Sequence, residues 1–225
     1  MKTIMLGLTL LGLVSSALAV DQAELDNRIR MLTAKFDEMQ QKPDKRIPAE
    51  TLSKARGIVL LDRTKAGFIF AYQGGGGVAL VKNKSGNWSP AAFLTASEAS
   101  LGAQIGGEEN FFVFVFMDTN SLYQLTGQNS ELGSEVRSTA GNDTAGVGSK
   151  VTSPKQYNNV LVYDDRKGLY AGAFVKGGAI LADDKANQIY YGRFLTMKNI
   201  LFDKKVKPTE TATDLAKKIK GYSEK

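Results

Sequence analysis

Residues 111–116 read Phe-Phe-Val-Phe-Val-Phe, and this stretch decides the fold class. Six consecutive apolar residues are typical of a β-strand that is covered on both faces, because a half-exposed strand alternates apolar and polar residues. Glu108, Glu109 and Asp118 flank the run, where charged side chains oppose aggregation. We therefore expect a central strand here, in a sheet with packed layers on both sides.

Further short apolar runs with turn residues between them surround this strand, at residues 57–61, 67–72, 78–81, 160–163 and 169–174. The connections are short, and short connections join antiparallel strands, because a parallel crossover needs about a dozen residues or more. Helical patterns precede and follow this region. The sequence thus predicts an α+β fold, with an antiparallel, curved or barrel-like β-sheet core and flanking N- and C-terminal helices.

Residues 21–41 predict an amphipathic first helix. Its apolar residues recur at spacings of 4, 3, 4 and 3 and therefore share one stripe, formed by Leu25, Ile29, Leu32, Phe36 and Met39. Arg28 and Lys35 lie on one flank of the stripe. The pattern allows two interpretations. The stripe could enter a membrane interface while the two cations reach lipid phosphates, or it could dock on the sheet or on a partner helix, which we favour.

The last part of the chain is helical and basic. Helices are expected at residues 183–191 and 194–202, and Thr211 with Asp214 predicts the start of a final helix through a capping box. Residues 198–225 carry eight Lys against four acidic side chains. Three of these lysines lie on the polar side of the final helix, namely Lys217, Lys218 and Lys220.

The first 19 residues predict a secretory signal peptide. Lys2 is followed by an apolar segment at residues 4–14 and by Ala17-Leu18-Ala19, which fits a cleavage site. The mature protein is then expected to be exported, periplasmic or secreted, and peripherally membrane-associated. The predicted division is a signal peptide, an amphipathic helix with its connector, a core domain and a basic C-terminal helix, at residues 1–19, 20–46, 47–202 and 203–225.

Composition narrows the function classes. The 225-residue chain has no Cys and no His, which excludes thiol nucleophiles, imidazole bases and zinc sites built from these residues. The glycine run at residues 74–77 lies between two strands and is not followed by the Lys-Ser/Thr of a phosphate-binding loop, so it predicts turns and close strand packing. The net charge of +6 is a mild basic excess. We expect no catalytic residues, no cofactor, no metal and no nucleic-acid partner.

Several blocks of sequence resemble the SYLF domain family. They include Trp-Ser-Pro-Ala-Ala-Phe and Gln-Ile-Gly-Gly, and the similarity runs in order through roughly residues 25–200. The blocks in chain order are 47–57, 65–68, 74–78, 88–93, 104–107, 167–172 and 186–192.

The resemblance implies a non-enzymatic, lipid-binding function. In yeast and animals, SYLF domains stand beside Src-homology-3 domains in endocytic actin-regulating proteins and bind acidic lipids, partly through an amphipathic helix at the start of the domain. Acidic phospholipids or a membrane surface are the expected partner. A protein partner for the same helix is the alternative, and actin is not expected because export would separate the chain from it. The expected lipid-binding residues are Arg28, Leu32, Lys35, Phe36, Lys45, Arg46, Lys217, Lys218 and Lys220.

Overall fold

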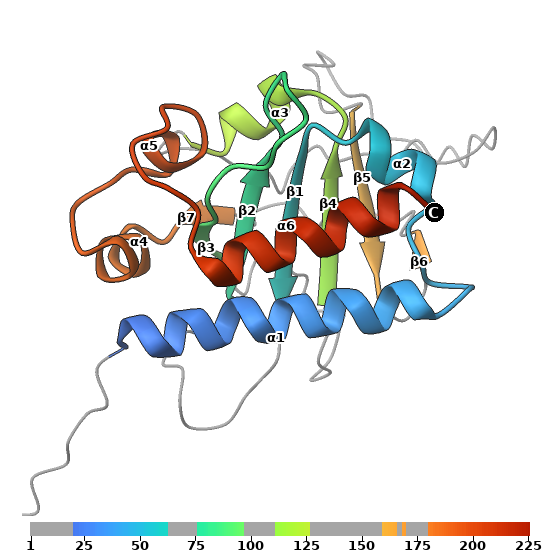
Figure 1. Cartoon of the computed structure of the whole chain (residues 1–225), viewed down its shortest axis with the longest axis horizontal. Coiled ribbons are helices and arrows are strands. Elements are labelled where there is room, and N and C mark those ends of the chain that lie inside the picture. Colours follow the sequence, from blue (N-terminus) through green and yellow to red (C-terminus); the bar gives the residue numbers. More distant parts are fainter. Residues whose placement is uncertain (1–19, 63–75, 97–110, 127–158, 166–167, 170–179) are drawn as a thin grey trace, which may run out of the picture.

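The computed structural model describes residues 20–62, 76–96, 111–126, 159–165, 168–169 and 180–225 (Figure 1). The predicted signal peptide lies outside these residues. The helices are α1 (Gln22–Gln41), α2 (Ala49–Lys54), α3 (Thr119–Gln124), α4 (Asp184–Tyr191), α5 (Met197–Leu201) and α6 (Glu210–Ser223). The strands are β1 (Gly57–Asp62), β2 (Gly76–Val81), β3 (Ala92–Ala96), β4 (Phe111–Phe116), β5 (Val160–Asp164), β6 (Gly168–Leu169) and β7 (Ile180–Ala182).

These strands form one antiparallel sheet in the order β6-β5-β4-β1-β2-β3-β7. The predicted α+β class is confirmed. The run at residues 111–116 is β4, which pairs with β1 on one side and β5 on the other. All six of its side chains are buried. Alternate residues belong to two different clusters, so the prediction of a central strand covered on both faces is also confirmed.

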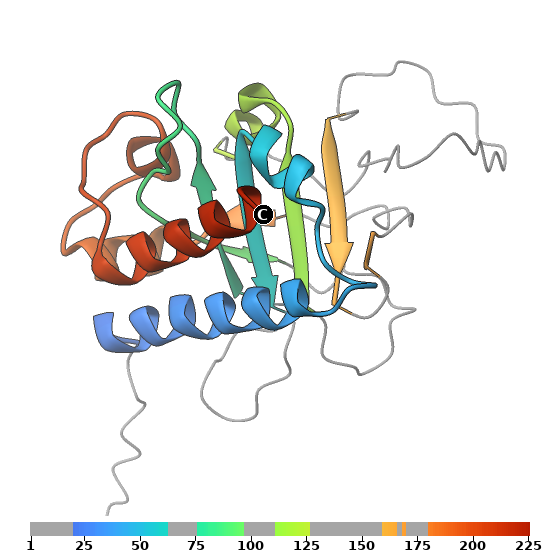
Figure 2. The same cartoon turned by 45° about the vertical axis from the view of Figure 1, so that its right-hand side comes forward.

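Helices cover the two faces of the sheet unequally. One face packs against α1, α6, α2 and α4, and α1 and α6 cross it side by side (Figures 1 and 2). The other face packs against α3 and α5. The first face is therefore covered by helices from both ends of the chain and the second face by α3 and α5. Because both faces are covered, the strands between them read as continuous apolar runs.

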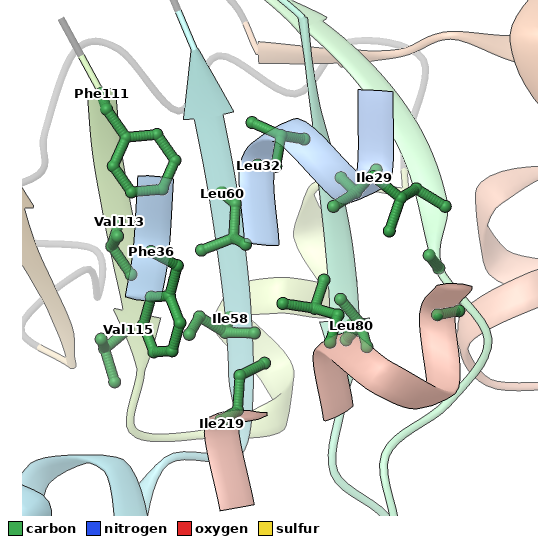
Figure 3. Close-up of a cluster of buried hydrophobic side chains, with 14 of the residues drawn as sticks. Ile29, Leu32, Phe36, Ile58, Leu60, Leu80, Phe111, Val113, Val115 and Ile219 are labelled. Atoms are coloured by element: carbon green, nitrogen blue, oxygen red, sulfur yellow. The ribbon is translucent and has the colours of Figure 1, made fainter. Parts of the chain in front are cut away.

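The stripe of α1 is entirely buried. Asp21 begins the helix by accepting a hydrogen bond from the Glu24 N–H at 2.8 Å. Figure 3 shows the side chains of α1 in one cluster with those of β1 and β4, among them Leu32, Phe36 and Leu60. Burying an apolar side chain of this size contributes about 1.5–3 kcal/mol. Five of them contribute about 7–15 kcal/mol before entropy, as much as the net stability of a typical domain.

Two of the remaining local predictions need correction, and the strand expected at residues 67–72 and residues 170–174 of another expected strand lie outside the described residues. Gly77 of β2 packs directly on the backbone of Leu60, so this part of the glycine run serves close strand packing. The helix expected at 194–202 begins only at Met197, because the Thr196 capping box sets its first turn. The final helix begins at Glu210 with Thr209 as its N-cap. The predicted capping box at Thr211 is wrong, because that hydroxyl donates to Asp26 of α1 instead.

Candidate functional site

The helices α1 and α6 run side by side in the same direction on one face of the sheet (Figures 1 and 2). Their starting ends are joined by a polar cluster. The Tyr190 hydroxyl and the Thr211 hydroxyl donate to Asp26 Oδ1 at 2.7 and 2.6 Å. The Tyr190 oxygen also lies 2.7 Å from Thr209 Oγ1. This junction satisfies every hydroxyl it contains, so its role is to hold α1, α4 and α6 together.

The other ends of the two helices enclose an open groove of about 440 Å³. At its floor, Asp37 of α1 accepts hydrogen bonds from the Tyr222 hydroxyl at 2.6 Å and from Lys218 Nζ at 3.0 Å. The bond from Tyr222, with that from Lys218, lowers the pKa of Asp37 below its ordinary value, although burial acts in the opposite direction. The groove is lined by Thr33, Asp37, Asp214, Lys217, Lys218, Gly221, Tyr222 and Lys225.

The rim of the groove is cationic and exposed. Lys217 pairs with Asp214 at 3.2 Å while 73% of its side chain remains exposed. Lys225 Nζ lies 4.3 Å from the centre of the Tyr222 ring. Exposed ion pairs contribute only about 0–1 kcal/mol. Lys217 can therefore exchange its carboxylate partner for a phosphate at little cost. The open space beside Gly221, where an added Cβ would meet no atom within 4 Å, leaves room for a phosphate.

The predicted site residues of α1 lie elsewhere. Leu32 and Phe36 are 1% and 0% exposed and face the sheet. Arg28 lies 3.9 Å from Asp183, the N-cap of α4, with 11% of its side chain exposed. Lys35 pairs with Asp62 of β1 at 2.8 Å. Of the two interpretations of the stripe, docking on the sheet is the one found, and the stripe is not exposed to a lipid or a partner helix.

The other predicted residues fall into two groups. Lys217 and Lys218 line the groove. Lys220 is outside the lining and pairs with Glu224 at 3.6 Å. Lys45 pairs with its neighbour Asp44, and Arg46 is exposed, both beyond the end of α1. The predicted site did not include the other groove residues, namely Thr33, Asp37, Asp214, Gly221, Tyr222 and Lys225. No local pattern identifies Asp37 and Tyr222, because they are 185 positions apart and meet only through packing.

The described part of the chain contains neither a membrane-spanning helix nor a cluster of metal-binding side chains. No helix there has the length and apolar character needed to cross a membrane. In the same residues, no three acidic side chains gather in a way that could hold a metal ion.

Comparison with known proteins identifies the family. A sequence profile described as "Las17-binding protein actin regulator", of the name Ysc84, matches residues 97–222. The chain belongs to the Ysc84 family. This is the SYLF family expected from the sequence blocks, so that prediction is confirmed at the level of the family. The family description names protein binding and actin regulation.

Relatives in yeast and mammals share the domain within longer chains. Protein YSC84 of Saccharomyces cerevisiae is 32% identical over 160 residues, which cover 70% of this chain and 34% of the yeast protein. SH3 domain-containing YSC84-like protein 1 of Homo sapiens is 27% identical over 184 residues, which cover 81% of this chain and 53% of the human protein. This Ysc84-family chain thus spans about a third to a half of the length of these relatives.

Proposed function

We propose that this Ysc84-family chain is a non-enzymatic lipid-binding protein of the cell envelope. It binds acidic phospholipid surfaces, and the groove between α1 and α6 receives the headgroup phosphate. The observation that carries the proposal is that Lys217, Lys218 and Lys225 line the same open groove. Ammonium donors around a cavity are the chemistry that binds phosphate.

In this proposal α1 does not insert into the membrane. Because its apolar stripe is buried, α1 contributes one wall of the groove and the carboxylate that orients Lys218 and Tyr222. The affinity then comes mainly from charge, at about 1 kcal/mol for each Lys near an anionic surface. Binding of this kind is peripheral, reversible and sensitive to salt.

We also propose export, with the chain acting at an envelope membrane in the periplasm or outside the cell. The support is the leader pattern of residues 1–19. N-terminal sequencing of the protein recovered from the exported fraction tests this directly, since cleavage after Ala19 would leave Val20 as the first residue. Recovery of an uncleaved chain from the cytosol would contradict it.

Co-sedimentation with vesicles tests lipid binding. The purified protein should pellet with phosphatidylglycerol-containing vesicles and stay in solution with pure phosphatidylcholine. Replacing Lys217 and Lys218 by Gln should weaken binding by about 30-fold, from two contributions of about 1 kcal/mol. A matched control replaces Lys42 and Lys54, which are equally charged, exposed and paired with Glu38 and Glu50. Equal losses in both double variants would show that the groove has no special role.

A protein-interaction module of the envelope is the second candidate, favoured by the family description, which names a protein partner. Cross-linking in cells followed by purification distinguishes the two. Recovery of one stoichiometric protein, together with absence of vesicle binding by the purified chain, would replace the lipid proposal by this one.

A further inference from the structure

Because the stripe of α1 is buried, a lipid-binding protein of this fold needs another apolar side chain to enter the bilayer. Among the described residues, four large apolar side chains are exposed, and Phe194 is the most exposed of them at 67%. It lies in the short turn between α4 and α5, at one end of the molecule (Figure 1). A single exposed apolar residue is ordinary in proteins. The exposure of Phe194 alone therefore does not indicate a function, and the turn and charges around it have to be considered.

The turn that carries Phe194 is ordered by its own contacts. Gly192 ends α4 in the left-handed conformation at a φ of 66°, and Thr196 begins α5 through a capping box with Asn199. The next residue, Leu195, is only 5% exposed and belongs to the core under α5. Leu195 thus fixes the turn from inside while Phe194 points outward. The exposure of the ring is consequently a property of the fold.

The segment that contains Phe194 is strongly cationic. Residues 192–208 contain one acidic residue, Asp203, against five exposed cations, namely Arg193, Lys198, Lys204, Lys205 and Lys207. Arg193 donates a hydrogen bond to the Lys205 carbonyl, which ties the Phe194 turn to the loop after α5. The ion pairs found within the described ranges include none of these five cations, whereas Lys217 and Lys218 of the groove are paired with carboxylates. Lys198 Nζ lies 5.6 Å from the centre of the Tyr123 ring. We call residues 192–208 the α4–α6 corner.

We propose that the α4–α6 corner is a membrane anchor, in which Phe194 enters the interface of an anionic bilayer while the surrounding cations contact lipid phosphates. This inference rests on the proposed lipid-binding function and assigns its apolar component. An exposed apolar ring in a segment rich in long cationic side chains matches the boundary between headgroups and acyl chains, where ammonium groups stay at the phosphates as the ring goes deeper. Phe194 thus provides the apolar group that enters the bilayer, which the buried stripe of α1 cannot do.

Tryptophan fluorescence reports the position of residue 194 directly. The Phe194→Trp variant should shift to shorter wavelength on addition of phosphatidylglycerol-containing vesicles and be quenched by brominated acyl chains. The matched control is Met31→Trp on the outer face of α1, which is 47% exposed and should show neither effect. The chain has a single native tryptophan, Trp88, whose signal in the wild-type protein provides the baseline.

Affinity measurements provide the second arm. Phe194→Ser should keep the thermal midpoint of the wild-type protein and lower vesicle affinity at least about tenfold, equivalent to about 1.4 kcal/mol. Met31→Ser should bind as the wild-type protein does. If the wild-type protein pellets with anionic vesicles but Phe194→Trp shows no shift and Phe194→Ser binds normally, the anchor is refuted and lipid binding stands.

Two other results would distinguish the failure of lipid binding as a whole from a protein-binding role of the corner. If the wild-type protein does not pellet with anionic vesicles, the proposed function fails and this inference fails with it. If Phe194→Ser abolishes a stoichiometric complex with another protein and leaves vesicle binding intact, the corner is a protein-binding surface and the anchor is refuted.

Discussion

Replacement of Phe36 by Ala tests whether α1 is docked in solution as it is in the structure. The Phe36 side chain is fully buried among residues of β1 and β4, and its ring stands edge-on to Tyr222 with the centres 5.9 Å apart (Figure 3). Losing the burial of a Phe ring costs about 1.5–3 kcal/mol, and the cavity that remains adds to this. We expect Phe36→Ala to lower the free energy of unfolding by about 3–5 kcal/mol.

Urea denaturation followed by circular dichroism measures this loss. The midpoint should fall while the dependence on urea stays the same, because the same surface is exposed on unfolding. Met31→Ala is the matched control, since Met31 is on the same helix and 47% exposed, and it should change stability by less than about 0.5 kcal/mol. A loss below about 1 kcal/mol for Phe36→Ala would refute the docked helix and make insertion of its stripe plausible again.

Three further predictions concern single sites. Gly221→Ala should raise the unfolding free energy by about 1 kcal/mol in thermal melts, because the site is helical and open. Gly77→Ala should lower it by about 1–3 kcal/mol, because the new methyl group would overlap the Leu60 carbonyl oxygen. The hydrogen bond from Tyr222 is the main cause that lowers the pKa of Asp37. The ionised Asp37 therefore stabilises the fold above its unfolded pKa, and this stabilisation is lost as the pH falls through its folded pKa. Asp37→Asn should therefore be less stable than the wild type at about pH 7, and the difference should shrink by about pH 3.

The sheet and the helices could be predicted because their patterns are local. Residues 111–116 and the 4-3 spacing of α1 each carry their own period. The surface that covers an apolar stripe, in contrast, is not encoded in the neighbouring sequence. The same spacing fits a membrane, a partner helix or a sheet, and the residues that decide it, such as Leu60 and Val113, lie far along the chain from α1.

The groove could be predicted only in part, for a related reason. Lys217 and Lys218 stand out because cations cluster in the sequence near the end of the chain. Asp37 is an ordinary helix carboxylate by sequence, and only the parallel alignment of α1 and α6 brings it to Tyr222. Phe194 was included in a predicted helix, where an aromatic residue is expected to pack. Its exposure follows from the later start of α5 at Met197.

The energies argue that membrane binding leaves α1 in place. Undocking the helix would forfeit about 7–15 kcal/mol of apolar burial. A bilayer could accept the stripe, but the sheet face formed by Ile58, Leu60 and Val113 would remain uncovered. The three lysines at the groove offer about 1 kcal/mol each, too little to offset that exposure. A lipid-binding role for this chain is therefore compatible with the docked fold only, with contact through cations and exposed side chains. Such contact weakens as added salt shortens the screening length below about 8 Å.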